Sequence, residues 1–194
     1  VPMLRYITHP QVRVSAEVAV PRWGLNDVGR SRVVRALQAQ SWISTSGRLV
    51  SSGETKALET AAIIAAHTGL RIEVRDRLHE NDRSSTGFVP PERFESLADA
   101  FFANPDIAIE GWETSAAAQA RVVSATADLL SSADDVIVVG HGGVGTLLLC
   151  HLLRVSISRD EDQVGGDAAP GGGNFWAFDV HRGEVLHRWR PIDQ

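Results

Sequence analysis

The sequence has very little cysteine, since Cys150 is the only one among 194 residues. A single cysteine excludes a disulfide within the chain, and its place in the apolar run TLLLCHLL is typical of a small buried residue rather than a reactive thiol. Long apolar runs are lacking as well, because none approaches the roughly 18 residues of a membrane-spanning helix. We therefore expect a soluble protein with no membrane partner, folded as a single domain over residues 1–194.

An excess of positive charge is also lacking. The 19 lysines and arginines are outnumbered by 24 aspartates and glutamates, which gives a formal net charge of −5. No basic run stands out, so we expect no nucleic-acid partner, and an anionic ligand would need a local pocket. The first residues do not show a basic segment followed by an apolar one, so we expect no secretory signal and predict a cytoplasmic location.

Short apolar runs alternate with helical patterns along most of the chain. The run DDVIVVG at 134–140 is rich in β-branched residues without alternation, which is typical of a strand buried on both faces of a parallel sheet. Strands are predicted at residues 3–8, 47–52, 71–78 and 134–140, helices at 25–40, 54–69, 90–105, 114–130 and 144–153, and a closing hairpin at 174–191. This alternation predicts an α/β fold with three layers, α/β/α, around a mostly parallel central sheet.

Two further features concern single segments. Within the helix at 25–40, Val33, Val34 and Leu37 are expected on one face. The only low-complexity tract is GGDAAPGGGN, at residues 165–174.

Polar residues stand at the carboxyl end of each predicted parallel strand, where the ends of neighbouring strands meet at one edge of the sheet. His9 follows the first strand, the serines at 51–52 end the second, Glu80 follows the third and His141 follows the fourth. The serines open a helix that carries Lys56. Two histidines, a carboxylate, a cation and a helix N-terminus supply a nucleophile, an acid and an electrostatic clamp, which together suit phosphoryl transfer.

The residues around these strand ends resemble the signature of the histidine phosphatase superfamily, the group of cofactor-dependent phosphoglycerate mutases and many small-molecule phosphatases. That signature is Arg-His-Gly after the first strand, Ser-Ser-x-x-x-Arg-Ala at the second helix, Leu-x-Glu after the third strand and Gly-His-Gly after the fourth. The matching segments are THP at 8–10, SSGETKALETA at 51–61, LHE at 78–80 and VVGHGG at 138–143. The resemblance covers almost the whole chain and implies a phosphoglycerate mutase-like fold.

The resemblance also implies roles for individual residues. His9 would be the nucleophile that takes the phosphoryl group, Glu80 the proton donor to the departing oxygen, and His141 the partner that stabilises the transferring group. The implied reaction is the hydrolysis of a small-molecule phosphate ester through a phosphohistidine at His9, with no metal and no other cofactor. A capping insertion is expected at about 81–113, where Phe88, Phe102 and Trp112 either line an apolar recognition wall or pack in the core.

The chain departs from this signature at three positions. Thr8 and Lys56 stand where the signature has arginines, and Pro10 replaces a glycine and so removes a backbone N–H. Arginine binds phosphate as a bidentate fork, whereas lysine is a point charge and threonine offers one hydroxyl. We expect nearby arginines to compensate. The predicted phosphate-binding residues are therefore Thr8, Lys56, Arg13, Arg83 and Gly142.

Several alternatives stay open. The clamp substitutions also fit a weak or inactive phosphoester-binding module on the same fold, and a phosphoglycerate mutase-type phosphotransferase is a further alternative, although the short insertion with few cations favours a phosphatase. GHGGVG at 140–145 has the glycine spacing of a dinucleotide-binding turn, but only about 50 residues follow it, too few for that fold. A homodimer is left open.

Overall fold

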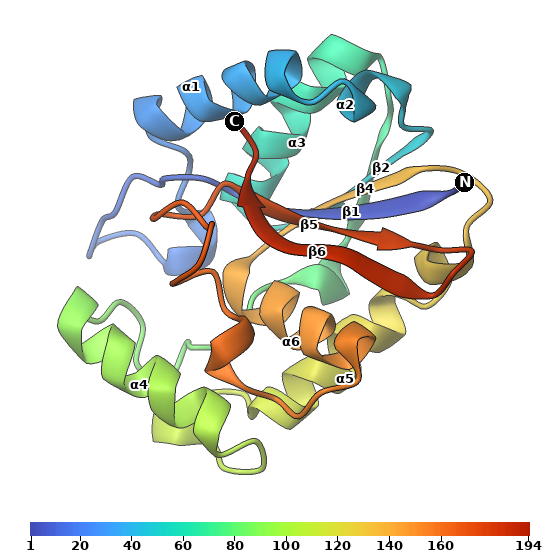
Figure 1. Cartoon of the computed structure of the whole chain (residues 1–194). Helices are drawn as coiled ribbons and strands as arrows, with labels where there is room; N and C mark the ends of the chain where they lie inside the picture. Colours follow the sequence, from blue (N-terminus) through green and yellow to red (C-terminus); the bar gives the residue numbers. More distant parts are fainter.

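The computed structural model describes all of residues 1–194, and its centre is a six-stranded sheet between two layers of helices (Figure 1). The strands are β1 (Met3–Thr8), β2 (Arg48–Ser52), β3 (Ile72–Arg75), β4 (Val136–Gly140), β5 (Asn174–Asp179) and β6 (Glu184–Pro191). Their order is β3-β2-β4-β1-β5-β6. Neighbours among the first four strands are parallel, whereas β5 runs antiparallel to β1 and to β6. The predicted three-layer α/β/α fold with a mostly parallel sheet is confirmed.

The helices divide between the two faces of the sheet. They are α1 (Asp27–Ala39), α2 (Trp42–Thr45), α3 (Thr55–Thr68), α4 (Pro91–Ala103), α5 (Ser115–Thr126) and α6 (Gly142–Leu153), with short 3-10 turns at 20–22, 76–78, 109–111, 129–131 and 159–161. Figure 1 shows α1, α2 and α3 on one face, α5 and α6 on the other, and α4 beyond the carboxyl ends of the parallel strands. None of these helices is both long and apolar enough to cross a membrane.

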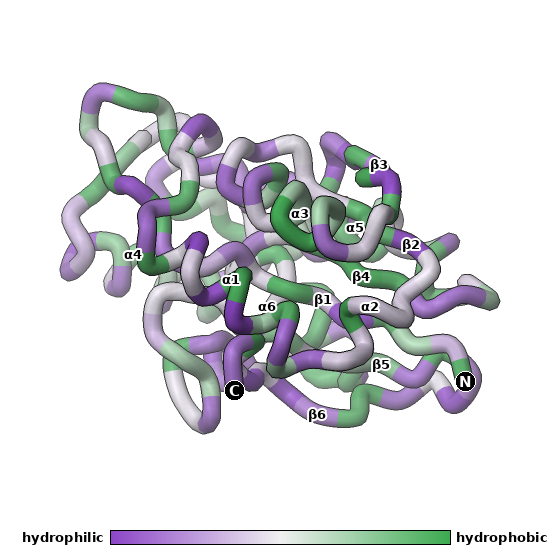
Figure 2. The backbone as a smooth tube through the Cα atoms, turned by 90° about the horizontal axis from the view of Figure 1, so that it is seen from above, coloured by the Kyte–Doolittle hydropathy of each residue, from purple (hydrophilic) through white to green (hydrophobic).

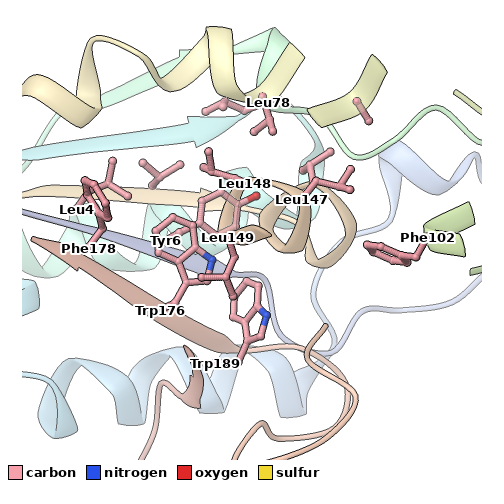
Figure 3. Close-up of a cluster of buried hydrophobic side chains, with 14 of the residues drawn as sticks. Leu4, Tyr6, Leu78, Phe102, Leu147, Leu148, Leu149, Trp176, Phe178 and Trp189 are labelled. Atoms are coloured by element: carbon pink, nitrogen blue, oxygen red, sulfur yellow. The ribbon is translucent and has the colours of Figure 1, made fainter. Parts of the chain in front are cut away.

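The core consists of two apolar clusters, one on each face of the sheet. Alternation along β1 divides its side chains, so that Leu4 and Tyr6 join one cluster and Ile7 joins the other. The rings of Tyr6 and Trp176 stack with centroids 5.2 Å apart, and Trp189 packs edge-on against both (Figure 3). Figure 2 shows hydrophobic stretches on β1 and β4, the two central strands, and on α3. Burial of apolar side chains on both faces of the sheet is the main contribution to its stability.

The buried face of α1 differs from the prediction. Val33 is buried and Leu37 is partly buried, but Val34 is 51% exposed, and Arg32 and Ala36 complete the stripe that faces the sheet. The side chain of Arg32 is buried because it finds hydrogen-bond acceptors there. Its guanidinium donates to the backbone oxygens of Gly172 (2.7 Å) and Gly173 (3.0 Å).

Arg32 also forms a buried ion pair with Asp193, with 3.1 Å between Nη2 and Oδ1 and both side chains less than a tenth exposed. This pair ties α1, the glycine tract and the C-terminal segment to one another.

We expect Arg32→Ala to lower the free energy of unfolding by about 3 kcal/mol, because the variant removes the buried guanidinium that donates to Asp193 and to two backbone oxygens, and leaves Arg35 as the remaining partner of Asp193. Urea unfolding followed by tryptophan fluorescence measures the change. The control is Arg30→Ala on the same helix, since the pair between Arg30 and Glu59 is largely exposed and worth under about 1 kcal/mol. Equal losses in the two variants would contradict this account of the Arg32 pair.

Candidate active site

The pairing of β1 with β4 brings the two predicted active-site histidines together. Thr8 lies opposite Gly140 in the parallel register, so His9 and His141 leave the sheet side by side. The backbone N–H of His9 donates to the oxygen of Gly140 (3.1 Å), and the two imidazole rings meet edge-on with centroids 5.4 Å apart.

The imidazole of His9 is held in one tautomer. Its Nδ1 lies 2.9 Å from the carbonyl oxygen of Pro10, and because a carbonyl only accepts, Nδ1 carries the proton. Burial, together with the neighbouring His141 and the positive charge of Lys56, lowers the pKa of His9 to about 3. The ring is therefore neutral at pH 7, and the lone pair on its Nε2 is free to attack.

The low-complexity tract fixes the backbone of His9. The N–H of Gly173 donates to the His9 oxygen (3.1 Å), and Gly171, Gly172 and Gly173 all have φ between 65° and 80°. A Cβ on Gly172 would lie 2.3 Å from the His9 oxygen. The tract thus requires glycine both for its left-handed backbone and for its close approach to His9.

His141 is fully buried and held from two sides. Its Nε2 lies 2.8 Å from the hydroxyl of Ser52, and the hydroxyl of Tyr6 accepts from its backbone N–H (3.0 Å) and donates to its backbone oxygen (3.1 Å). Burial lowers the pKa of His141, so the ring is neutral at pH 7. Its Nδ1 is buried without a hydrogen-bond partner.

The carboxylate of Glu80 occupies the N-terminus of α6. It accepts from the backbone N–H groups of Gly143, Val144 and Asn81 at 2.9, 2.9 and 3.0 Å. A Cβ on Gly143 would lie 2.6 Å from Oε1, so glycine is needed for this approach. Burial would raise the pKa of Glu80, but the charge of Arg83, the nearby His141 and these amides lower it, so Glu80 is ionised at pH 7.

Lys56 is buried, but its charge is matched inside the protein. Its Nζ lies 2.6 Å from the carboxylate of Glu54 and donates to the backbone oxygen of Val20 (2.8 Å). Burial disfavours the ionised form of Glu54, yet His141 and Lys56 outweigh it and lower the pKa of Glu54 to about 2. Glu54 also accepts from the backbone N–H of Glu80 (2.9 Å), which fixes the position of the predicted acid.

Of the remaining predicted phosphate-binding residues, Arg83 and Gly142 line the cavity beside His9, whereas Thr8 and Arg13 do not. Thr8 is fully buried and turns its hydroxyl to Gln163 and Asn174. Arg13 is exposed and does not line the cavity beside His9, whereas Arg83 and Gly142 do. The structure therefore does not bring Arg13 to the site.

The cavity beside His9 has a volume of about 300 Å³ and an aromatic wall. The guanidinium of Arg83 lies over Phe94 (4.9 Å) and Trp112 (5.6 Å) and forms no ion pair. The other arginine that lines this cavity, Arg159, is paired with acidic groups that include Asp99. Arg83 is thus the arginine whose charge is available to a ligand.

A second cavity of about 550 Å³ shares Glu80, Asn81 and Arg83 with the first. Its apolar wall is formed by residues 18–21 and by Phe88, which is 40% exposed and packs on Trp23. Phe102 and Trp112, in contrast, are almost fully buried in the core and border only the first cavity. Phe88 therefore lines a cavity wall, whereas Phe102 and Trp112 pack in the core and also border the first cavity.

Three residues at the site carried no signal in the sequence. Glu54 precedes α3, Asn81 follows the predicted acid, and Gln163 lies in the loop after α6. Glu54 stands at an unspecified position of the motif at 51–61, neither Asn81 nor Gln163 belongs to a motif, and the contacts of all three depend on which loops meet. No group of three or more histidine, cysteine, aspartate or glutamate side chains is placed to hold a metal ion.

Comparison with known proteins gives two kinds of likeness. The family model of the histidine phosphatase superfamily (branch 1) matches residues 12–165, a range that begins after His9. No curated protein matches the chain in sequence.

The second likeness is to solved structures. A mycobacterial glucosyl-3-phosphoglycerate phosphatase with inorganic phosphate is 20% identical over 100% of both chains, with a TM-score of 0.75. A mutant phosphoserine phosphatase from Entamoeba histolytica in complex with phosphoserine is 14% identical over 99% of this chain and 98% of its own, with a TM-score of 0.77. The protein YhfR of Bacillus stearothermophilus is 17% identical over 97% and 95%, with a TM-score of 0.74. At these identities the likeness concerns the fold alone.

The neutral state of His9 can be tested in solution. Because the pKa of His9 is about 3, well below its ordinary value near 6.5, its ring nitrogen shifts should stay constant between pH 8 and pH 5 and report the Nδ1–H tautomer. Nitrogen-15 NMR of selectively labelled histidine measures this, with His9→Ala to assign the signal. The exposed His181 serves as the internal control. A His9 titration centred near pH 6.5 would contradict the neutral state of this ring.

Proposed function

The chain belongs to the histidine phosphatase superfamily, and on this premise we propose that it hydrolyses small phosphate monoesters in two steps through a phosphohistidine at His9, without a metal ion. The observation that carries the proposal is the hydrogen bond from His9 Nδ1 to the Pro10 oxygen, which leaves Nε2 unprotonated beside a cavity that an arginine lines. Phosphoryl transfer asks mainly for positioning and charge neutralisation, and the rigid carboxyl ends of β1 and β4 supply the positioning.

In the first step, His9 Nε2 forms a bond to phosphorus while the bond from phosphorus to the alcohol oxygen breaks. The departing oxygen takes a proton from Glu80. In the second step, water attacks the phosphohistidine, Glu80 takes the water's proton, and the bond between nitrogen and phosphorus breaks to release phosphate. Each cycle thus returns His9 and Glu80 to their starting states.

Glu80 must gain a proton before it can donate one, since it is ionised in the free site. A phosphate monoester has its second pKa near 6 and so brings a proton into the site as its monoanion. Once a phosphoryl group lies beside Glu80, like-charge repulsion raises the pKa of the carboxyl. A proton carried by the substrate can therefore pass to Glu80 and on to the departing oxygen.

The larger cavity is the proposed place for the alcohol part of the substrate. It adjoins Glu80, the proposed proton donor, and its walls include Val18, Val20 and Phe88. Its charged lining is mostly acidic, with Glu17 and Asp82 near the rim, which disfavours a second anionic group on the substrate. We therefore propose a monoester with an apolar alcohol part.

A phosphoester-binding module with little turnover is the second candidate. It is favoured by the pairing of Lys56 with Glu54, which leaves Arg83 as the principal free cation at the site. The same shortage of cations disfavours a mutase, which would have to hold a bisphosphate.

The first test is hydrolysis of p-nitrophenyl phosphate in the presence of a chelator. We expect turnover by the wild type, and a loss of at least about a thousandfold in His9→Ala, because the nucleophile is removed. Radiolabelled substrate quenched in alkali should leave an acid-labile phosphoprotein only when His9 is present. His181→Ala, which changes an exposed histidine, is the control. If His9→Ala is as active as the wild type, the proposed mechanism is wrong; a silent wild type that binds orthovanadate in calorimetry would instead support the binding module.

The second test separates the acid from the nucleophile. We expect Glu80→Gln to slow hydrolysis of 2-phenylethyl phosphate by about a hundredfold or more, because an alkoxide needs a proton to depart. Hydrolysis of p-nitrophenyl phosphate should fall by less than about tenfold, since its stable phenolate leaves without one. Steady-state rates on both substrates give the ratio. Equal losses on the two substrates would remove Glu80 from the role of proton donor.

A further inference from the structure

We propose that the carboxamide nitrogen of Gln163 binds the transferring phosphoryl group. It acts as a neutral donor in place of the arginine that the resemblance to the superfamily implies at position 8, where this chain has Thr8. This inference rests on the proposed function, because it assigns a ligand-binding role at that same site. Gln163 lies in the loop after α6 and lines the cavity beside His9.

The amide of Gln163 lies against the N-terminus of α6. A Cβ built on Gly142 would lie 2.5 Å from Gln163 Nε2, which is the nearest atom to that position. Gly142 therefore admits the amide in the same way that Gly143 admits the carboxylate of Glu80. The two adjacent glycines bring a donor and an acid to one end of the cavity.

A chain of hydrogen bonds determines which way this amide faces. The side chain of Asn174 donates through Nδ2 to the backbone oxygen of Ala169 (2.9 Å) and accepts through Oδ1 from its backbone N–H (2.7 Å). Because a carbonyl cannot donate and an N–H cannot accept, the orientation of Asn174 is settled. Its Nδ2 also donates to Gln163 (3.0 Å), so the atom of Gln163 that receives this bond is the carbonyl oxygen.

Thr8 fixes the same oxygen from the other side. Its hydroxyl accepts from the backbone N–H of Asn174 (3.0 Å) and donates to Gln163 Oε1 (2.9 Å). With Oε1 held by two donors, both N–H bonds of Gln163 point away from Thr8 and Asn174. Thr8 is thus a positioning residue, and Gln163 is the residue that contacts the ligand.

The donors around this end of the cavity lack acceptors in the protein. Gln163 uses only its oxygen in hydrogen bonds to other side chains, so its Nε2 is free. Asn81, which is 6% exposed and lines both cavities, has a buried Nδ2 without a partner. Unpaired buried donors are destabilising, and an anion with several acceptor oxygens is the ligand that would satisfy them.

The sharpest test is Gln163→Glu. This variant keeps an oxygen for Thr8 and Asn174 and changes only the group that we assign to the ligand, from a donor to a negatively charged acceptor. Calorimetry with inorganic phosphate should show binding weakened by at least about tenfold, and p-nitrophenyl phosphate should show a raised KM. The matched control is Gln38→Glu, which adds the same charge at an exposed position of α1 and should leave both values unchanged.

Thr8 gives an independent readout of the positioning role. Thr8→Val keeps the shape but loses the hydroxyl, so we expect a raised KM without direct removal of a ligand contact. Thr8→Ser should recover most of the loss, because it restores the donor to Gln163 Oε1. Gln163→Met is the substitute if the glutamate variant fails to fold, since it keeps the length of the side chain and removes the whole amide, donor and acceptor together, without adding charge.

Phosphate binding and kcat/KM of folded Gln163→Glu within twofold of the wild type would overturn the assignment. So would the absence of phosphate and vanadate binding in the wild type. If the wild type binds phosphate, loses this binding in Gln163→Glu and hydrolyses nothing, the inference stands and the proposed hydrolysis fails. If the wild type hydrolyses p-nitrophenyl phosphate and Gln163→Glu does so equally well, the proposed hydrolysis stands and the inference fails.

Discussion

The register between β1 and β4 is the constraint on which the rest of the site depends. Opposing Thr8 to Gly140 places two histidines from distant parts of the chain at the same level of the sheet edge. It also puts the Tyr6 hydroxyl between the N–H and the oxygen of His141. A slip of one residue would exchange the faces of β1, so Tyr6 would leave its aromatic stack and the histidine would lose its support. The same apolar side chains that stabilise the fold therefore determine the geometry of the chemistry.

Charge in the site is largely balanced before any ligand arrives. Lys56 is matched by Glu54, and Glu80 is matched by the nearby charge of Arg83, the helix dipole and three amides. Arg83 keeps its charge available because it rests on aromatic rings instead of a carboxylate. A buried neutral donor costs less to desolvate than a buried cation, which fits a site whose one buried lysine is paired with a carboxylate.

The sequence predicts the parts of the structure that depend on local pattern. The central strands, the helices and the polar residues at the strand ends follow from periodicity and from short motifs. The third strand is shorter than predicted, ending at Arg75, because residues 76–78 form a 3-10 turn, and the helix predicted to 130 ends at Thr126. The sequence does not predict Glu54, Gln163 or the buried Arg32, since their partners come from loops far along the chain. The prediction for Val34 is wrong for the same reason: local hydrophobicity does not show that Arg32 has acceptors in the glycine tract.

Composition alone makes residues 165–174 look like a passive spacer, but the tolerance of this tract to change is uneven. A side chain at Gly165 would extend into open space, one at Gly166 would meet no neighbour but would strain a backbone with φ of 63°, and one at Gly172 or Gly173 would collide with His9 or Arg32. Substitutions at Gly165 should therefore be tolerated, and those at Gly172 and Gly173 should be selected against. A library of variants built for altered specificity would do well to leave the second half of the tract untouched and to vary the loop at its start.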